Sequence, residues 1–257
     1  MIEAVMDTLP AQYLALAAAA ALVAGFIKGA VGFGMPMIMI SAFGSFMHPQ
    51  LALAALIVPT LFSNAWQALR DGIGPALATI LQFRLFMALL LVFILASAQL
   101  AAALPPRALL LIIGVPVTVF AAAQLAGWRL AIKPERRKRA EAIMGVLAGF
   151  TGGLSGVWGP PTVAYLTAID APRQESMRTQ GVVYGAGSVM LALAHLRSGL
   201  LNAETSPVSI AMLAPALLGM AIGFQISDRL DQRKFRSATL AVLVVAGLNL
   251  IRRGAIG

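Results

Sequence analysis

A glycine- and proline-rich stretch occurs twice in this chain and limits what the chain can fold into. The first copy spans residues 24–36 and the second spans residues 148–161. Each copy ends an apolar, helix-like run with residues that let the backbone leave a helix. The two copies match position by position: Gly25, Phe26, Gly29 and Gly32 correspond to Gly149, Phe150, Gly153 and Gly156. The second copy then has a one-residue insertion near Trp158, after which Gly34 and Pro36 correspond to Gly159 and Pro161.

The chain around these stretches is too apolar for a water-soluble domain. Hydrophobic residues make up 60% of it, charged residues 11%, and the mean hydropathy is +0.87. A soluble domain carries about 25% charged residues. The apolar runs are long and do not alternate with a period of two, which predicts helices that cross a membrane. We therefore expect an all-α polytopic membrane protein, whose first apolar run stays in the mature chain because no basic residue precedes it.

Charge and cysteine content exclude several kinds of chemistry. The chain has no cysteine, so disulfides, thiol catalysis and cysteine-ligated metal sites are excluded, and we expect no cofactor. The net charge is +9, and the densest basic run covers residues 129–139. Such a run is typical of a cytoplasmic loop that touches anionic lipid headgroups, and no aromatic-interleaved motif accompanies it. We therefore expect membrane lipids as partners, and no nucleic acid.

The order of segments indicates two tandem repeats of four segments each, or about eight helical segments. We assign residues 1–128 to the first transmembrane repeat, residues 129–140 to a basic cytoplasmic loop, and residues 141–257 to the second repeat. Each repeat opens with a broken helix or a re-entrant hairpin. Landmarks such as Arg70-Asp71-Gly72 and Arg197-Ser198-Gly199 recur in the two halves.

Two topologies fit this plan, and the distribution of basic residues favours one of them. If each broken stretch crosses the membrane once, the halves are parallel, with eleven basic residues inside and seven outside. If each broken stretch returns to its own side, the halves are inverted, with fourteen basic residues inside and four outside. The positive-inside rule therefore favours the inverted repeat.

The broken segments predict a site for an anion near the middle of the membrane. Two interrupted apolar segments in corresponding halves of a chain point to the binding site of a transporter. Helices that start at about Met35 and Pro161 would direct their N–H groups and positive dipole ends into a shared cavity. Lys28 is the one ionisable residue of the first stretch, and a bound anion would supply its counter-charge. The alternative is that Lys28 extends to the membrane surface.

Other residues of both copies, and of the helices that follow, are candidates for the same site. Close helix packing is an alternative role for Gly25, Gly29, Gly149 and Gly153, because small residues four apart let helices approach. Polar side chains on the following helices either line the cavity or hydrogen-bond a neighbouring helix. The candidate substrate-binding residues are Lys28, Gly29, Gly32, Gly34, Pro36, Asn64, Gln67, Gly153, Ser155, Gly156, Trp158, Gly159, Pro161 and Tyr184.

The paired glycine-rich breaks, their spacing and the central basic loop resemble the TauE/SafE family, the sulfite exporter or DUF81-type permeases. The resemblance covers nearly the whole chain. It implies a secondary transporter that moves a small anion, of the sulfite or sulfonate type, across the bacterial inner membrane, with a proton or sodium ion as a candidate coupling ion. The family pattern matches Gly29, Gly32, Gly34 and Pro36, and Gly153, Gly156, Gly159 and Pro161, whereas Met35 stands where many relatives continue a glycine run.

An enzyme and a channel are the rival hypotheses. Residues 153–156 fit the GxSG pattern of rhomboid intramembrane proteases, with Ser155 as nucleophile and His195 as base. However, the first copy has Val31 and Ala68 at the aligned positions while it keeps the glycines. The feature that the two copies share is the glycine-rich helix break and not the Ser–His pair, so we expect that the protein is not an enzyme. An anion channel is the third hypothesis.

Overall fold

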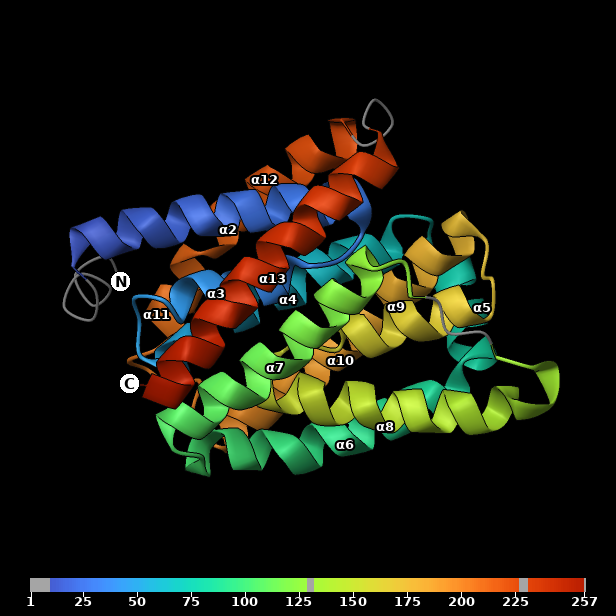
Figure 1. The fold of residues 1–257 in the computed structure, drawn as a ribbon, viewed down its shortest axis with the longest axis horizontal. Coiled ribbons are helices and arrows are strands. Elements are labelled where there is room, and N and C mark those ends of the chain that lie inside the picture. Colours follow the sequence, from blue (N-terminus) through green and yellow to red (C-terminus); the bar gives the residue numbers. More distant parts are fainter. Residues whose placement is uncertain (1–9, 129–131, 227–230, 257) are drawn as a thin grey trace.

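The computed structural model describes residues 10–128, 132–226 and 231–256, and every regular element among them is helical (Figure 1). This confirms the prediction of an all-α chain. The elements are α2 (Ala11–Val31), α3 (Met35–Phe43), α4 (Pro49–Leu69), α5 (Ile73–Gln82), α6 (Arg84–Ala103), α7 (Pro106–Leu125), the 3-10 turn η1 (Pro134–Arg136), α8 (Arg137–Ser155), α9 (Gly159–Ala168), α10 (Arg173–Arg197), α11 (Ser206–Ala211), α12 (Leu213–Ile226) and α13 (Gln232–Ile256).

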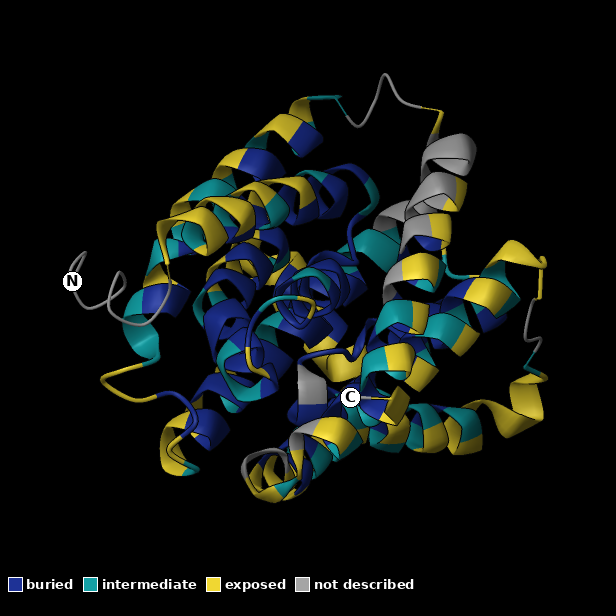
Figure 2. Cartoon of the chain, turned by 60° about the vertical axis from the view of Figure 1, so that its left-hand side comes forward, coloured by how far each residue is buried: buried dark blue, intermediate teal, exposed yellow. Residues whose placement is uncertain are grey.

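The lengths and surfaces of the helices fit a protein that crosses a membrane several times. Four stretches of the described chain are long and apolar enough to span a membrane: residues 11–31, 49–69, 107–125 and 206–226. A fifth would be the pair α5 and α6, which meet at a bend of 85°. Large apolar side chains such as Leu81, Val92 and Leu218 are exposed. Figure 2 shows exposed positions along the outer faces of the helices. Lipid tails solvate such faces, whereas water would not.

Each glycine-broken stretch folds as a helical hairpin that returns to its own starting end. The ring of Tyr13, at the start of α2, stacks on the ring of Phe46, just after α3, with centroids 5.7 Å apart. In the second stretch, the N–H of Ile132, ahead of α8, donates to the carbonyl of Ala168, the last residue of α9, at 3.2 Å. Figure 1 shows α3 and α9 each doubling back beside the helix that precedes it.

The main helix contacts join the two halves of the chain. The hairpin helix α2 packs along α12, while the hairpin helix α8 packs along α6, and α7 packs along α13. At the centre, α4 and α10 run antiparallel: Asn64 donates to the carbonyl of Tyr184 and Gln67 to that of Met177. The start of α4 and the end of α10 therefore lie at the same end of the bundle.

Glycines let the hairpin helices touch their partners backbone to backbone. A Cβ atom at Gly25 or Gly29 of α2 would overlap a main-chain oxygen of α12, and one at Gly223 of α12 would overlap the carbonyl of Phe26. On the other side, a Cβ at Gly149 or Gly153 would press on main-chain oxygens of α6. Such contacts between small residues drive helix association in a membrane, where burial of apolar surface contributes little.

This packing predicts the effect of a large side chain at one of these contacts. Gly223→Leu should lower the stability of the purified protein in detergent by about 3 kcal/mol, because α2 and α12 can no longer approach. Thermal unfolding followed by circular dichroism measures the change. The matched control is Gly74→Leu, since the Cβ position of Gly74 has no heavy atom within 4 Å. Equal melting temperatures for both variants would contradict this account of the packing.

Candidate functional site

Both hairpins turn at a glycine in the left-handed backbone region. Gly32 (φ +85°) ends α2 and its N–H donates to the carbonyl of Lys28 at 2.7 Å. Gly156 (φ +69°) ends α8 and donates to the carbonyl of Gly152, also at 2.7 Å. Gly34 adds a second left-handed position in the first turn (φ +97°). A side chain with a Cβ would be strained at these three positions, which explains why the sequence has glycine there.

The helices that leave the two turns offer different numbers of free backbone donors. In α3 the first N–H bonded within the helix is that of Ile38, which donates to Gly34 at 2.9 Å. The N–H groups of Met35 and Met37 precede it and have no carbonyl of their own helix to bind. In α9, prolines follow Gly159 at the next two positions and have no N–H. The N-terminal donors are therefore concentrated on α3, and α9 contributes the N–H of Gly159.

Lys28 is buried inside the protein beside neutral partners. Its side chain is 1% exposed, and its Nζ donates to Oδ1 of Asn64 on α4. The Nζ atom also lies 5.5 Å from the centroid of the Tyr184 ring. Lys28 therefore does not extend to the membrane surface. A charged side chain inside a membrane protein costs about 3 kcal/mol, so it is kept where it has a function or a partner.

Tyr184 on α10 connects the two hairpins. Its ring lies beside Lys28 of the first hairpin and 6.3 Å from the ring of Trp158 at the turn of the second. A Cβ atom at Gly159 would lie 3.6 Å from the Tyr184 hydroxyl and 3.9 Å from the sulfur of Met37. The first turn of α9 therefore meets the first turn of α3 at this tyrosine.

Buried polar atoms without partners surround this meeting point. Gln67 on α4 donates through Nε2 to the carbonyl of Gly32 at 3.0 Å, but its Oε1 has no hydrogen-bond partner. The hydroxyl of Tyr184 and that of Thr60 are also buried without partners. Buried polar groups in proteins are almost always paired, so these atoms have hydrogen-bonding capacity that a polar ligand or water would satisfy.

The structure thus brings Lys28, Gly32, Asn64, Gln67, Trp158, Gly159 and Tyr184 together. Two other candidates, Gly29 and Gly153, face α12 and α6 instead. Both glycines act in helix packing, and we leave them out of the site.

The remaining candidates shape the turns. A Cβ at Gly34 would approach side chains of its own hairpin, and one at Gly156 would approach Leu56 and Leu191. Pro36 and Pro161 lie in the first turns of α3 and α9. The side chain of Ser155 lies outside the described part of the structure.

Sequence reasoning missed three residues of this region: Thr60, Met37 and Met177. Thr60, Asn64 and Gln67 are spaced four and three apart on α4, so they share one face of the helix. A polar stripe within an uncharged run of apolar residues is the signal that could have identified Thr60. The two methionines give no such signal, because they look like ordinary apolar residues.

His195, the proposed base of the protease hypothesis, has other partners. Its Nε2 lies 3.2 Å from the carbonyl of Gly153, and its Nδ1 lies 3.4 Å from the hydroxyl of Ser198. A carbonyl can only accept a hydrogen bond, so in this contact Nε2 is the donor. The histidine ties α10 to the end of α8 instead.

A family model described as Sulfite exporter TauE/SafE matches residues 17–250. Neither the curated proteins nor the solved structures gave a match.

The contact between Lys28 and Asn64 predicts a strong coupling between these two residues. Asn64→Leu removes the acceptor and leaves the Lys28 amine buried without a partner, which should lower stability by about 2–3 kcal/mol. Adding Lys28→Met should restore most of the loss, since neither polar group then remains. Chemical unfolding of both single variants and the double variant in detergent measures the coupling. Strictly additive effects would show that the two residues do not depend on each other.

Proposed function

The chain belongs to the TauE/SafE sulfite exporter family, a family of membrane transporters, and from this premise we propose the site and the substrate. The protein is a multi-pass membrane transporter and not an enzyme. We propose that it carries a small oxyanion of the sulfite or sulfonate type across the bacterial inner membrane. We place the binding site where the two hairpins meet at Lys28 and Tyr184.

One observation carries the proposal: Lys28 is buried next to an amide and an aromatic ring. An anion that enters the site would supply the charge that these neutral partners lack. Hydrogen bonds between an ammonium group and an oxyanion are short and about twice as strong as neutral ones. The anion would compete with Asn64 for Lys28 and would leave the amide free to act as a second contact.

The other donors suit a small ligand with several oxygen atoms. The Tyr184 hydroxyl has a proton to donate and no partner. The N–H groups of Met35 and Met37 lie at the positive end of α3. A sulfite or sulfonate group has three oxygens that can accept these hydrogen bonds, and the buried side chain of Trp158 limits the size of the ligand.

For the transport cycle we propose an inverted repeat, with residues 1–128 and 141–257 as equivalent halves around the loop at 129–140. Two observations support it. Each hairpin ends next to the point where it starts, and the first helix of each hairpin packs on a helix of the other half, α2 on α12 and α8 on α6. In inverted repeats, movement of one half against the other opens the site to either side in turn. A proton or sodium gradient would drive the movement.

Transport in proteoliposomes tests the role of Lys28. Uptake of labelled sulfite by the Lys28→Met variant should fall by roughly 100-fold, since losing one partner of a buried charge pair costs about 2–5 kcal/mol. Lys138→Met, which removes an exposed lysine at the start of α8, is the matched control and should transport normally. Wild-type rates in Lys28→Met would refute the site. The same assay with sulfonates, carboxylates and a neutral sugar defines the substrate class.

Cysteine labelling tests the inverted topology, and the cysteine-free chain is a ready background. A cysteine at Glu204, after α10, should react with a membrane-impermeant maleimide added to spheroplasts, because the inverted repeat puts this loop outside. A cysteine at Lys133 should react only after permeabilisation, which makes it the control. If the cysteine at Glu204 also needs permeabilisation, the halves are parallel and the inverted model is wrong.

A further inference from the structure

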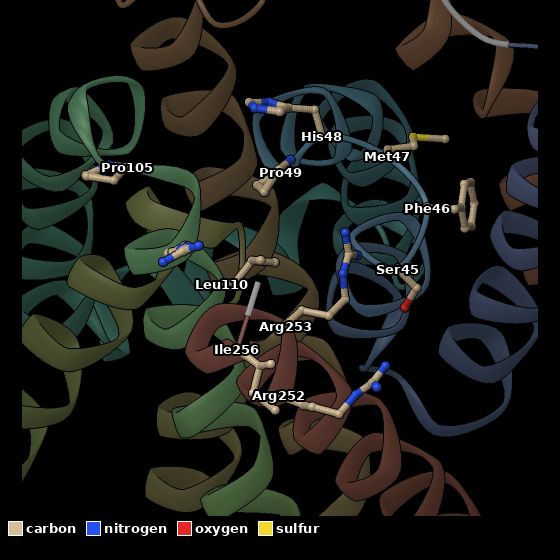
Figure 3. Close-up of a pocket in the computed structure, with 11 residues that line it drawn as sticks. Ser45, Phe46, Met47, His48, Pro49, Pro105, Leu110, Arg252, Arg253 and Ile256 are labelled. Carbon is tan, nitrogen blue, oxygen red and sulfur yellow. The ribbon is translucent and has the colours of Figure 1, made fainter.

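A large pocket with a strong positive charge opens at one end of the bundle, away from Lys28. Its volume is about 990 Å³, and it lies where α3 ends, α4 and α7 begin and α13 ends (Figure 3). Three arginines line it, Arg107, Arg252 and Arg253, and none of the described residues around it is acidic. Arg107 and Arg252 are exposed and Arg253 is half-buried. Three like charges gathered around one hollow repel one another, and a bound negative charge would relieve this repulsion.

The two arginines of α13 have different surroundings. Arg253 reaches from the helix between Leu110 and Ser45 (Figure 3), and its Nη1 is buried without a hydrogen-bond partner. Arg252 is exposed at the rim, where its Nη2 donates to Oδ1 of Asn249 at 3.2 Å. Asn249 in turn donates to the hydroxyl of Ser45 at 2.8 Å. One guanidinium is therefore held at the opening, and the other has an unused donor inside.

Two helix N-termini add to the positive potential. Both α4 and α7 begin at this pocket, at Pro49 and Pro106, and each helix is at least 20 residues long. The start of a helix carries roughly half a unit of positive charge. These dipoles and the three guanidinium groups attract the same kind of ligand, because planar guanidinium groups match the oxygen atoms of an oxyanion.

We propose that this pocket is an oxyanion-binding vestibule that collects the transported anion before it reaches Lys28. The idea rests on the proposed function above. The pocket is far larger than a bare oxyanion, so the ion stays hydrated there. From Pro49 at the vestibule, α4 runs about 22 Å to Asn64, at 1.5 Å per residue. The buried hydroxyls of Ser41 on α3 and Thr60 on α4 have no partners and offer polar contacts along these helices.

The kinetics of transport test the vestibule. In proteoliposomes of zwitterionic lipid, Arg252→Gln and Arg253→Gln should each raise the KM for sulfite up to about tenfold and leave kcat unchanged. The reason is that the positive field raises the rate at which the anion associates with the protein and not the rate of the later steps. Added salt should raise the KM of the wild type more than that of the variants. Arg197→Gln is the control, since Arg197 is exposed at the same end of the bundle but outside the pocket. An unchanged KM in both variants would overturn the proposal.

A binding measurement keeps this test separate from the proposed function. Phenylglyoxal modifies accessible arginines, and peptide mass spectrometry gives the rate at each one in detergent-solubilised protein. Inorganic sulfate should slow the modification of Arg252 and Arg253 and not that of Arg197, even if the protein does not transport sulfite. The phosphate of a lipid headgroup is the other source of an oxyanion, so the same measurement is made with added anionic phospholipid. Protection by the lipid alone, or by neither compound, would overturn the vestibule.

Discussion

The structure depends on one unusual constraint, a lysine side chain enclosed by the protein within a membrane-spanning bundle. Lys28 binds Asn64 and lies beside the Tyr184 ring, and neither partner carries a charge. A chain that had only to fold would place an apolar residue here, since a charge at this depth destabilises it. In the proposed transport of an anion, the substrate would supply the counter-charge of this lysine. Binding and folding would then be linked, because an anion that binds only the folded protein would stabilise it.

The surrounding framework holds this lysine against its partners through backbone contacts. Glycines on α2 and α12, and on α8 and α6, bring main chains into direct contact and fix both hairpins along their length. The turns at Gly32 and Gly156 are then positioned against α10 and α4 from opposite halves of the chain. Packing glycines and turn glycines therefore have separate roles, although they alternate in the same short stretch of sequence.

Much of this organisation could be predicted from the sequence. The composition predicted membrane-spanning helices, and the duplicated glycine pattern predicted where both hairpins turn. The spacing of four residues offered helix packing as an alternative role for Gly29 and Gly153. The sequence could not decide between packing and the site, because a glycine's role depends on which helix faces it. It also could not choose between a buried and a surface-seeking Lys28, since that depends on Asn64, 36 residues away. The bend between α5 and α6 has no proline or charge cluster to mark it.

The arginine pocket and the Lys28 site would together give the anion an entrance and a binding place along α4. The central claim is that the anion binds Lys28, and the most direct measurement is a crystal structure with selenite, a heavier analogue of sulfite that scatters X-rays anomalously. We predict a selenium peak about 3–4 Å from Lys28 Nζ, with a selenite oxygen in hydrogen-bond range and Asn64 released. If selenium binds elsewhere and Lys28 stays on Asn64, the account is wrong.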